Sequence, residues 1–284
     1  MYDSFTKMLN AAKTGDVTAR REVAHTFLYE NDMEELELEI TDLCLRYLNE
    51  AAESGDPDAM MDLGGMYLTG RGVPYSRDEA LRWYLQAAGK MHPLAFNRIA
   101  QVFLYDEDEE GLGYLPPTND PVRLQKAYEF FCAGAKLGEA GCMNELGVMY
   151  MVGECVEPDF RKGFRWFKKA HDEATVCDTG DKAQAAYSLA KCYHYGEGTE
   201  QNLSLAVRYA LEAIELNEEE YEAGCTGSHY FVEEAEEELL KILTDMKCTD
   251  EEVMEYVQEY TEAGMTSGKT MDTLFKVVFR VNGE

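Results

Sequence analysis

The chain has 284 residues, a formal net charge of −29 and 45% hydrophobic residues. This hydrophobic content predicts a folded protein, and the length fits one elongated array or two compact domains. The strong negative charge argues against a nucleic-acid partner, because binding to phosphates requires a basic surface. The same charge is compatible with simple solubility and with attraction of a basic partner.

The sequence contains no apolar run that approaches the roughly 20 residues needed to cross a bilayer. The first 16 residues fit an amphipathic helix and lack the apolar centre of a secretory signal. We therefore expect a cytoplasmic protein with no membrane insertion. The eight cysteines include no Cys-x-x-Cys pair and have no regular pairing distance. In a cytoplasm such thiols would stay reduced.

A repeating unit is most apparent in residues 51–88, which begin and end with an Ala-Ala pair, 36 residues apart. The unit predicts two helices. Asp56 is placed to cap the first, with Pro57 in its first turn, and the glycines and proline of residues 70–74 end it. The second helix is predicted to start near Ser76, with a possible capping box formed by a glutamate three residues later.

The same helical pair recurs along the chain and can be followed at one marker position of its first helix. A small residue precedes each marker by four positions, and an aromatic residue follows it by four. This spacing is one face of a helix. Cys44 and Cys142 occupy positions where the repeat has small residues, so we interpret them as buried structural thiols. The marker residues are Val23, Leu63, Ile99, Leu146 and Leu189.

Residues 59–88 contain the pattern A-x-x-x-L-G-x-x-Y, then G-x-G-V, then A-L-x-W-Y-x-x-A-A. This pattern resembles the Sel-one-like repeat, a 36-residue variant of the tetratricopeptide-type helical hairpin. The resemblance implies an all-α fold, in which about five hairpins stack into a right-handed α-α superhelix, or solenoid, with capping helices at both ends.

The expected domain organisation follows from this alignment. Residues 1–15 form an N-terminal capping helix, residues 16–216 hold the repeats, and residues 217–284 form a degenerate helical cap. The tail at 273–281 is compatible with a helix or a strand. The repeats cover approximately 16–52, 53–88, 89–135, 136–171 and 180–216.

An acidic insertion at 106–121 separates the two helices of one repeat. It lacks the spacing of a calcium-binding loop, and we interpret it as a solvated acidic loop. We find no pattern of catalytic residues, and no His pair at ligand spacing. We interpret His25 and His194 as ordinary surface residues. The sequence therefore predicts no catalytic residue, no metal, no cofactor and no enzyme activity.

Some secreted relatives with such repeats have been described as β-lactamases or penicillin binders, but their hairpins carry paired cysteines. Here Cys142 has no partner at the expected position, Ala135, which argues against that activity.

The resemblance implies that a partner would bind in a concave groove lined by the first helices. Asn97 and Asn144 are favoured, because asparagine gains little from a dry core and has a low helix propensity. The candidate groove residues are Met61, Asp62, Leu68, Asn97, Arg98, Gln101, Asn144, Glu145, Met151, Tyr187, Lys191 and His194.

The predicted function is a non-catalytic scaffold or adaptor, which binds a peptide segment or partner protein in this groove. The alternative is an enzyme or small-molecule binder, with its site in the groove or beneath the 106–121 insertion. A purely structural homo-oligomer is a third possibility.

Overall fold

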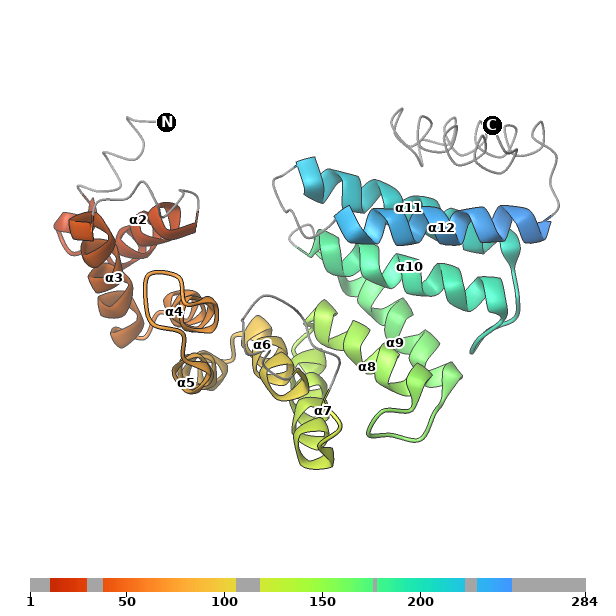
Figure 1. Cartoon of the computed structure of the whole chain (residues 1–284), viewed down its shortest axis with the longest axis horizontal. Coiled ribbons are helices and arrows are strands. Elements are labelled where there is room, and N and C mark those ends of the chain that lie inside the picture. The colour runs from red at the N-terminus through yellow and green to blue at the C-terminus, as the bar shows by residue number, and fades with distance from the viewer. Residues whose placement is uncertain (1–10, 30–37, 106–117, 176–177, 223–228, 247–284) are drawn as a thin grey trace. The chain divides into compact units, whose positions relative to one another are not determined.

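A computed structural model describes residues 11–29, 38–105, 118–175, 178–222 and 229–246 (Figure 1). Contacts divide the chain into two compact units, residues 1–137 and 138–284, and each is described by itself. Residues 1–10, most of the acidic insertion and everything after residue 246 lie outside the described residues. The predictions for the N-terminal cap, for the insertion and for the tail at 273–281 therefore fall largely outside them.

Unit 1 consists of consecutive helices that pair as antiparallel hairpins. Helix α2 pairs with α3, α4 with α5, and α6 with α7, and each hairpin packs on the next through α3–α4 and α5–α6 contacts. The helices are α2 (Val17–Tyr29), α3 (Leu38–Glu53), α4 (Pro57–Thr69), α5 (Arg77–Gly89), α6 (Pro93–Leu104) and α7 (Pro121–Lys136).

Unit 2 continues the same arrangement. Helix α8 pairs with α9 and α10 with α11, the two hairpins meet through α9 and α10, and α12 packs on α11 and α10. One buried cluster is shared by α10, α11 and α12. The predicted all-α repeat fold is thereby confirmed. The helices are α8 (Ala140–Val152), α9 (Phe160–Glu173), α10 (Thr179–Tyr195), α11 (Leu203–Glu222) and α12 (His229–Met246).

The ends of α4 and α5 follow the sequence signals. Asp56 Oδ1 accepts hydrogen bonds from the Asp58 and Ala59 amides at 3.0 and 3.2 Å, and Gly70 ends α4 in the left-handed conformation at φ 69°. Ser76 caps α5 by accepting from the Glu79 amide at 3.3 Å. Glu79 does not complete the capping box by accepting from the Ser76 amide, because its carboxylate pairs with Arg82 at 2.6 Å.

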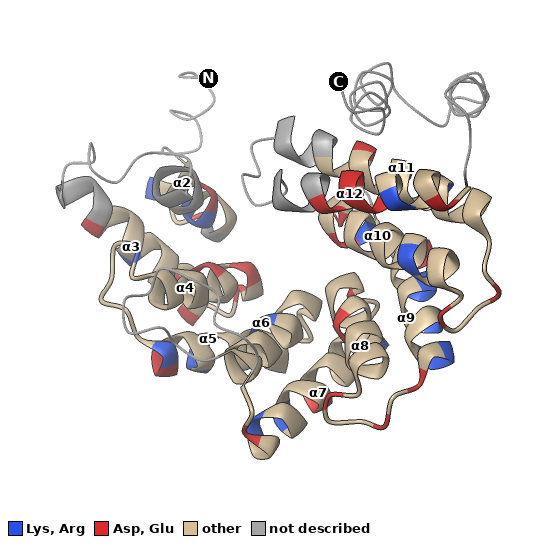
Figure 2. Cartoon of the chain, turned by 45° about the vertical axis from the view of Figure 1, so that its right-hand side comes forward, with Lys and Arg blue, Asp and Glu red and all other residues tan. Residues whose placement is uncertain are grey.

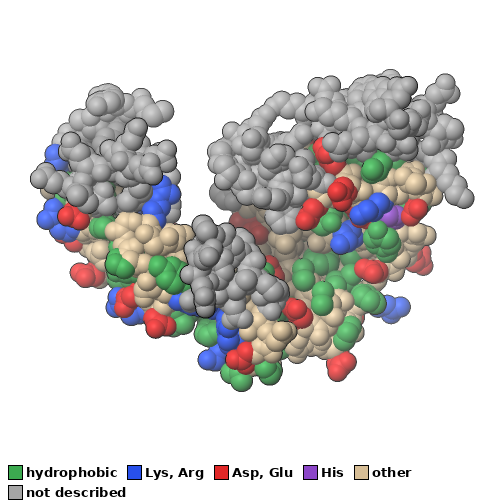
Figure 3. All heavy atoms as spheres, viewed as in Figure 1, with side chains coloured by type: hydrophobic (Ala, Val, Ile, Leu, Met, Phe, Trp, Pro, Cys, Tyr) green, Lys and Arg blue, Asp and Glu red, His purple; other side chains and the backbone are tan. Residues whose placement is uncertain are grey.

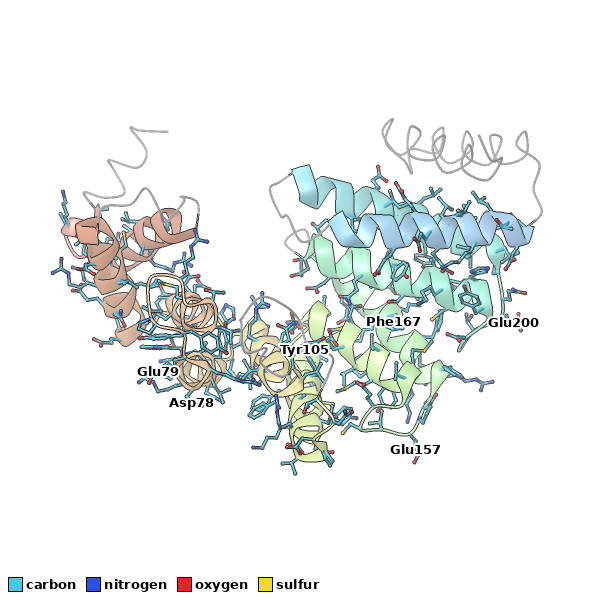
Figure 4. All side chains as sticks on the ribbon, in the orientation of Figure 1. Asp78, Glu79, Tyr105, Glu157, Phe167 and Glu200 are labelled. Carbon is cyan, nitrogen blue, oxygen red and sulfur yellow. The ribbon has the colours of Figure 1, made fainter. Side chains whose placement is uncertain are left out.

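Two glycines set how closely the helices of a hairpin approach. A Cβ on Gly64 of α4 would lie 2.3 Å from a ring carbon of Tyr84 on α5, and a Cβ on Gly147 of α8 would lie 2.4 Å from Phe167 on α9. Phe167 is labelled in Figure 4. The ring seated against Gly64 therefore belongs to Tyr84 and not to its neighbour Trp83. Both aromatic side chains are buried.

Two further predictions have clear outcomes. Cys44 and Cys142 are buried, as predicted, and burial is the main factor that raises the pKa of both thiols, that of Cys44 to about 11. The predicted boundary at residue 217 between the repeats and the C-terminal cap falls within α11, which continues to Glu222. Asn217 is buried inside this helix, and its side-chain amide donates to the Ala213 carbonyl at 2.8 Å.

Within the described ranges, no helix combines the length and apolar character that a bilayer-spanning segment requires. The same ranges contain no group of three or more side chains arranged to ligate a metal ion.

Candidate partner-binding surface

In unit 1 the predicted groove positions lie on α4 and α6. Arg98 is exposed, and its guanidinium donates to Gln101 Oε1 at 3.0 Å, so these two side chains form a polar pair on one face of α6. Met61 and Leu68 of α4 are partly buried and pack against the core of the unit. They fill space between helices and leave only part of their surface accessible.

Asp62 of α4 and Arg98 of α6 come from consecutive repeats, and the charges of both act on one phenol of unit 1. Burial raises the pKa of the Tyr84 phenol to about 12, and the nearby Arg98 charge lowers this pKa while the Asp62 charge raises it. Both charges therefore lie close to the same phenol, although α4 and α6 are separated in sequence by a complete second helix. That these matching positions form one continuous groove stays a prediction.

In unit 2, Tyr187 and Lys191 of α10 form a second pair. The Lys191 ammonium lies 5.4 Å from the centre of the Tyr187 ring, and Lys191 is exposed. Burial raises the pKa of the Tyr187 phenol to about 12, and acidic residues of α12 raise it further. Figure 2 shows that acidic residues gather on this last described helix.

Met151 serves the packing within unit 2. A Cβ on Gly163 of α9 would lie 2.6 Å from the Met151 sulfur, so this side chain occupies the space that the glycine leaves at the α8–α9 crossing. In the space-filling view, hydrophobic side chains are visible over the α8–α10 part of this unit among charged ones (Figure 3).

The two favoured asparagines are buried, with exposed fractions of 6% for Asn97 and 0% for Asn144. The argument that asparagine would avoid a dry interior is therefore wrong for this chain. For Asn144 the physical reason is a tertiary hydrogen bond, because its Nδ2 donates to the Asp181 carbonyl at 2.8 Å. Contact of either side chain with a partner stays a prediction.

His194 is also buried, with an exposed fraction of 1%, so its interpretation as a surface residue is wrong. Its ring nitrogens lie 2.7 Å from Glu238 Oε1 and 2.9 Å from Asp245 Oδ2, and both carboxylates belong to α12. This histidine joins the last helix to α10. The side chain of His25 lies outside the described residues.

Glu145 of α8 completes the predicted set. It is partly buried, and its pKa is raised by burial and by the charges of Asp181, Glu139 and Glu154. These three carboxylates are not among the residues predicted from the sequence. Glu139 could have been found, since it occupies the N-cap position that corresponds to Asp56 in the repeat. Asp181 lies in the first turn of α10, directly after a lengthened connection between repeats where the 36-residue alignment gives no guide.

Two cavities of moderate size lie elsewhere. One in unit 1, of about 260 Å³, is formed by α5, α6 and α7 near the base of the insertion, and its lining includes Arg77 and Arg123. Both guanidiniums donate to the carbonyl of Tyr105, at 2.9 and 2.8 Å. One in unit 2, of about 480 Å³, lies between the start of α9 and the α10–α11 turn, beside Glu200 (Figure 4).

These features define two units of packed helical hairpins, in which Arg98 and Lys191 of the first helices are exposed. The Sel1 repeat matches residues 41–56, 57–90, 140–172 and 183–218. The chain therefore contains Sel1 repeats. The hairpin α6–α7, which the insertion interrupts, is present in the structure although it falls between these matches.

Relatives and solved structures agree with this assignment. The chain is 26% identical over 149 residues to Activator of C kinase protein 1 of Saccharomyces cerevisiae, which covers 49% of this chain and 23% of that protein. It is 24% identical over 146 residues to a Sel1-like repeat-containing protein of Schizosaccharomyces pombe, covering 49% and 21%. It thus spans less than a quarter of the length of these two relatives.

The crystal structure of a Sel1 repeat protein from Oxalobacter formigenes superposes with a TM-score of 0.53 at 19% identity, covering 74% of this chain and 83% of that one. This likeness supports the fold.

Proposed function

We propose that the chain is a non-catalytic interaction module, a scaffold or adaptor that binds a segment of a partner protein on the exposed face of its first helices. Sel1 repeats are commonly found in protein-interaction scaffolds, which is consistent with this role. The proposal keeps the cytoplasmic location that the sequence predicts.

The observation that carries the proposal is that two accessible side chains of consecutive first helices, Asp62 of α4 and Arg98 of α6, both influence the Tyr84 phenol. It supports a continuous row of side chains across consecutive first helices, which is the surface that an extended peptide requires. The Arg98–Gln101 pair in unit 1 and the Lys191–Tyr187 pair in unit 2 supply hydrogen-bond donors, acceptors and an aromatic face along such rows.

The alternative, a small-molecule binder, draws support from the cavity of about 260 Å³ near the base of the insertion, whose arginines would suit an anion. Against it, both arginines already donate to a backbone carbonyl, and that leaves fewer donors for a ligand. We therefore prefer the interaction module. A thermal-shift screen of small carboxylates and phosphates tests the alternative, which requires stabilisation that Arg77→Ala with Arg123→Ala abolishes.

The test of the interaction module compares two double variants in affinity capture from the native host. The first, Arg98→Ala with Lys191→Ala, removes two cations from first helices. The second, Arg82→Ala with Lys169→Ala, removes two cations from second helices, where Arg82 lies 4.9 Å from the Trp83 ring and Lys169 lies 5.3 Å from the Trp166 ring. The two variants change the net charge equally, so a difference between them reports the location of the surface.

We expect specific partners of the wild-type chain to be lost with the first variant and retained with the second. The purified partner should then bind the first variant at least about 10-fold more weakly, as the loss of a charge-assisted hydrogen bond implies. Equal loss with both variants, or no protein enriched above an unrelated acidic protein, would refute the proposal.

A further inference from the structure

Helix α9 has the highest density of cations among the described helices. Five of its 14 residues are lysine or arginine, whereas the whole chain has 26 such residues among 284 and a net charge of −29. Figure 2 shows basic residues along this helix. Solubility accounts for the negative charge of the chain, but it does not account for a basic helix within so acidic a protein.

Two arginines on the exposed side of α9 have no counter-ion. Arg161 and Arg165 are both exposed, and residues four apart share one side of a helix. Among the described residues, neither guanidinium forms a salt bridge, whereas Lys162, Lys168 and Lys169 pair with carboxylates at 3.5, 3.2 and 3.6 Å. Each of the two arginines therefore keeps its N–H donors available to a partner.

The positive surface continues onto the next second helix, α11. His171 of α9 lies 2.9 Å from Glu212 of α11, so this side of α11 faces α9. Arg208 precedes Glu212 by four residues and thus lies on the same side of α11. It is exposed, and in the described part of the chain it has no carboxylate partner. We call the surface formed by Arg161, Arg165, Lys168 and Arg208 the basic band.

A cavity adjoins the band at the start of α9. It has a volume of about 480 Å³, and its lining includes Arg161 and Phe160, whose side chain is 48% exposed. The carboxylates of Asp159 and Glu200 also border it, so the cavity itself does not suit an anion. An exposed aromatic ring suits an apolar side chain instead. A bound segment would therefore place an apolar residue at Phe160 and its acidic residues along α9.

We infer that the basic band is a second docking surface, which binds a short acidic segment of a partner protein. Aspartate and glutamate side chains only accept hydrogen bonds, and they match the forked donors of Arg161 and Arg165. Charge complementarity selects this occupant over a nucleic acid, because a long polyanion would extend past the band onto a strongly negative chain. The inference goes beyond the proposed function, since it adds a surface on the second helices to the one on the first helices.

The test presents the full chain to an array of short peptides of random sequence, and the tightest acidic peptide is then followed by fluorescence anisotropy. The band variant, Arg161→Gln with Arg165→Gln, removes two cations of the basic band. The matched control, Arg46→Gln with Lys136→Gln, removes two exposed cations from α3 and α7 of unit 1. Both double variants change the net charge equally, and glutamine has a helix propensity similar to that of arginine and lysine.

We expect the array to select peptides rich in aspartate and glutamate. The tightest of them should bind the band variant at least about 10-fold more weakly than the wild type, because charge-assisted hydrogen bonds are lost. The control variant should bind this peptide as the wild type does. Replacing the acidic residues of the peptide with asparagine and glutamine should weaken its binding to the wild type by a similar factor.

No preference for acidic peptides, unchanged binding to the band variant, or equal loss with both variants would overturn the inference. A labelled single-stranded oligothymidine is the probe for a nucleic acid. If it bound the wild-type chain more tightly than the peptide and lost affinity with the band variant, the band would be a nucleic-acid surface and the inference would be wrong. Because Arg161 and Arg165 belong to a second helix, each of these results leaves the proposed function standing.

Discussion

The close approach of helices at Gly64 gives a prediction whose size follows from the structure. Replacing this glycine with alanine places a Cβ at 2.3, 2.5 and 2.8 Å from three ring atoms of Tyr84. Real Cβ atoms do not tolerate such distances, and the Tyr84 ring is 2% exposed, so it cannot swing into solvent without losing its packing. Overpacking of this kind costs about 1–3 kcal/mol.

Helix propensity acts in the opposite direction, because alanine is favoured over glycine in a helix by about 1 kcal/mol. The matched control is Gly89→Ala at the end of α5, where an added Cβ meets no atom within 4 Å. This control should stabilise the chain by up to about 1 kcal/mol. The difference between the two variants isolates the steric cost, which we expect to be about 1–3 kcal/mol.

Urea titration followed by far-ultraviolet circular dichroism measures both variants, with the midpoints compared at equal slope. A companion variant, Gly64→Ala with Tyr84→Leu, should recover part of the loss, because the smaller side chain makes room for the methyl group. If Gly64→Ala were as stable as Gly89→Ala, the close packing of α4 on α5 would be wrong.

Three further predictions concern single residues. Cys155 has a φ of 63°, so Cys155→Gly should stabilise the chain by about 0.5–1 kcal/mol in urea titration, and no gain would argue against the left-handed conformation. Burial raises the pKa of Glu145 to about 7 in the folded chain, whereas the unfolded pKa is about 4.3. The destabilisation caused by ionising this carboxyl is therefore absent below the unfolded pKa and complete above pH 7. Glu145→Gln should therefore gain stability relative to wild type as the pH rises from 4 to 8, by up to about 3 kcal/mol, and a constant difference would refute this. The hydrogen bond to Glu212 raises the pKa of His171. Burial alone would raise the pKa of Glu212, but the hydrogen bonds and charges of His171 and Lys182 together lower it. The His171–Glu212 pair should stabilise the fold most between the pKa values of its two members, and the free energy of unfolding should fall as the pH rises through the pKa of His171. His171→Asn should remove this fall at high pH. If the fall persisted in the variant, the pair would not be its cause.

The fold was predictable from sequence because it depends on local rules repeated along the chain. Asp56, Gly70 and Ser76 act through hydrogen bonds and backbone conformations that span only a few residues. A single hairpin contains all of that information, and the 36-residue period repeats it. The local pattern does not decide whether Trp83 or Tyr84 packs against Gly64. The two residues are adjacent on α5, about 100° apart around the helix, and both are buried.

The candidate site was less predictable because its contacts are tertiary. His194 reads as a surface residue until Glu238 and Asp245 are placed beside it, 44 and 51 residues away. Asn144 likewise acquires its partner carbonyl from Asp181, in the first turn of α10, which follows a connection whose length departs from the repeat. A repeat alignment orders the positions within a hairpin, but it does not place such irregular segments.

We propose that the first helices carry the binding surface. Hydrogen exchange of the full chain with and without the purified partner tests this proposal most directly. We expect added protection in α8 and α10 of unit 2, or in α4 and α6 of unit 1, with the amides of α5, α9 and α11 unchanged. Protection confined to the second helices α5, α9 and α11 would contradict the account.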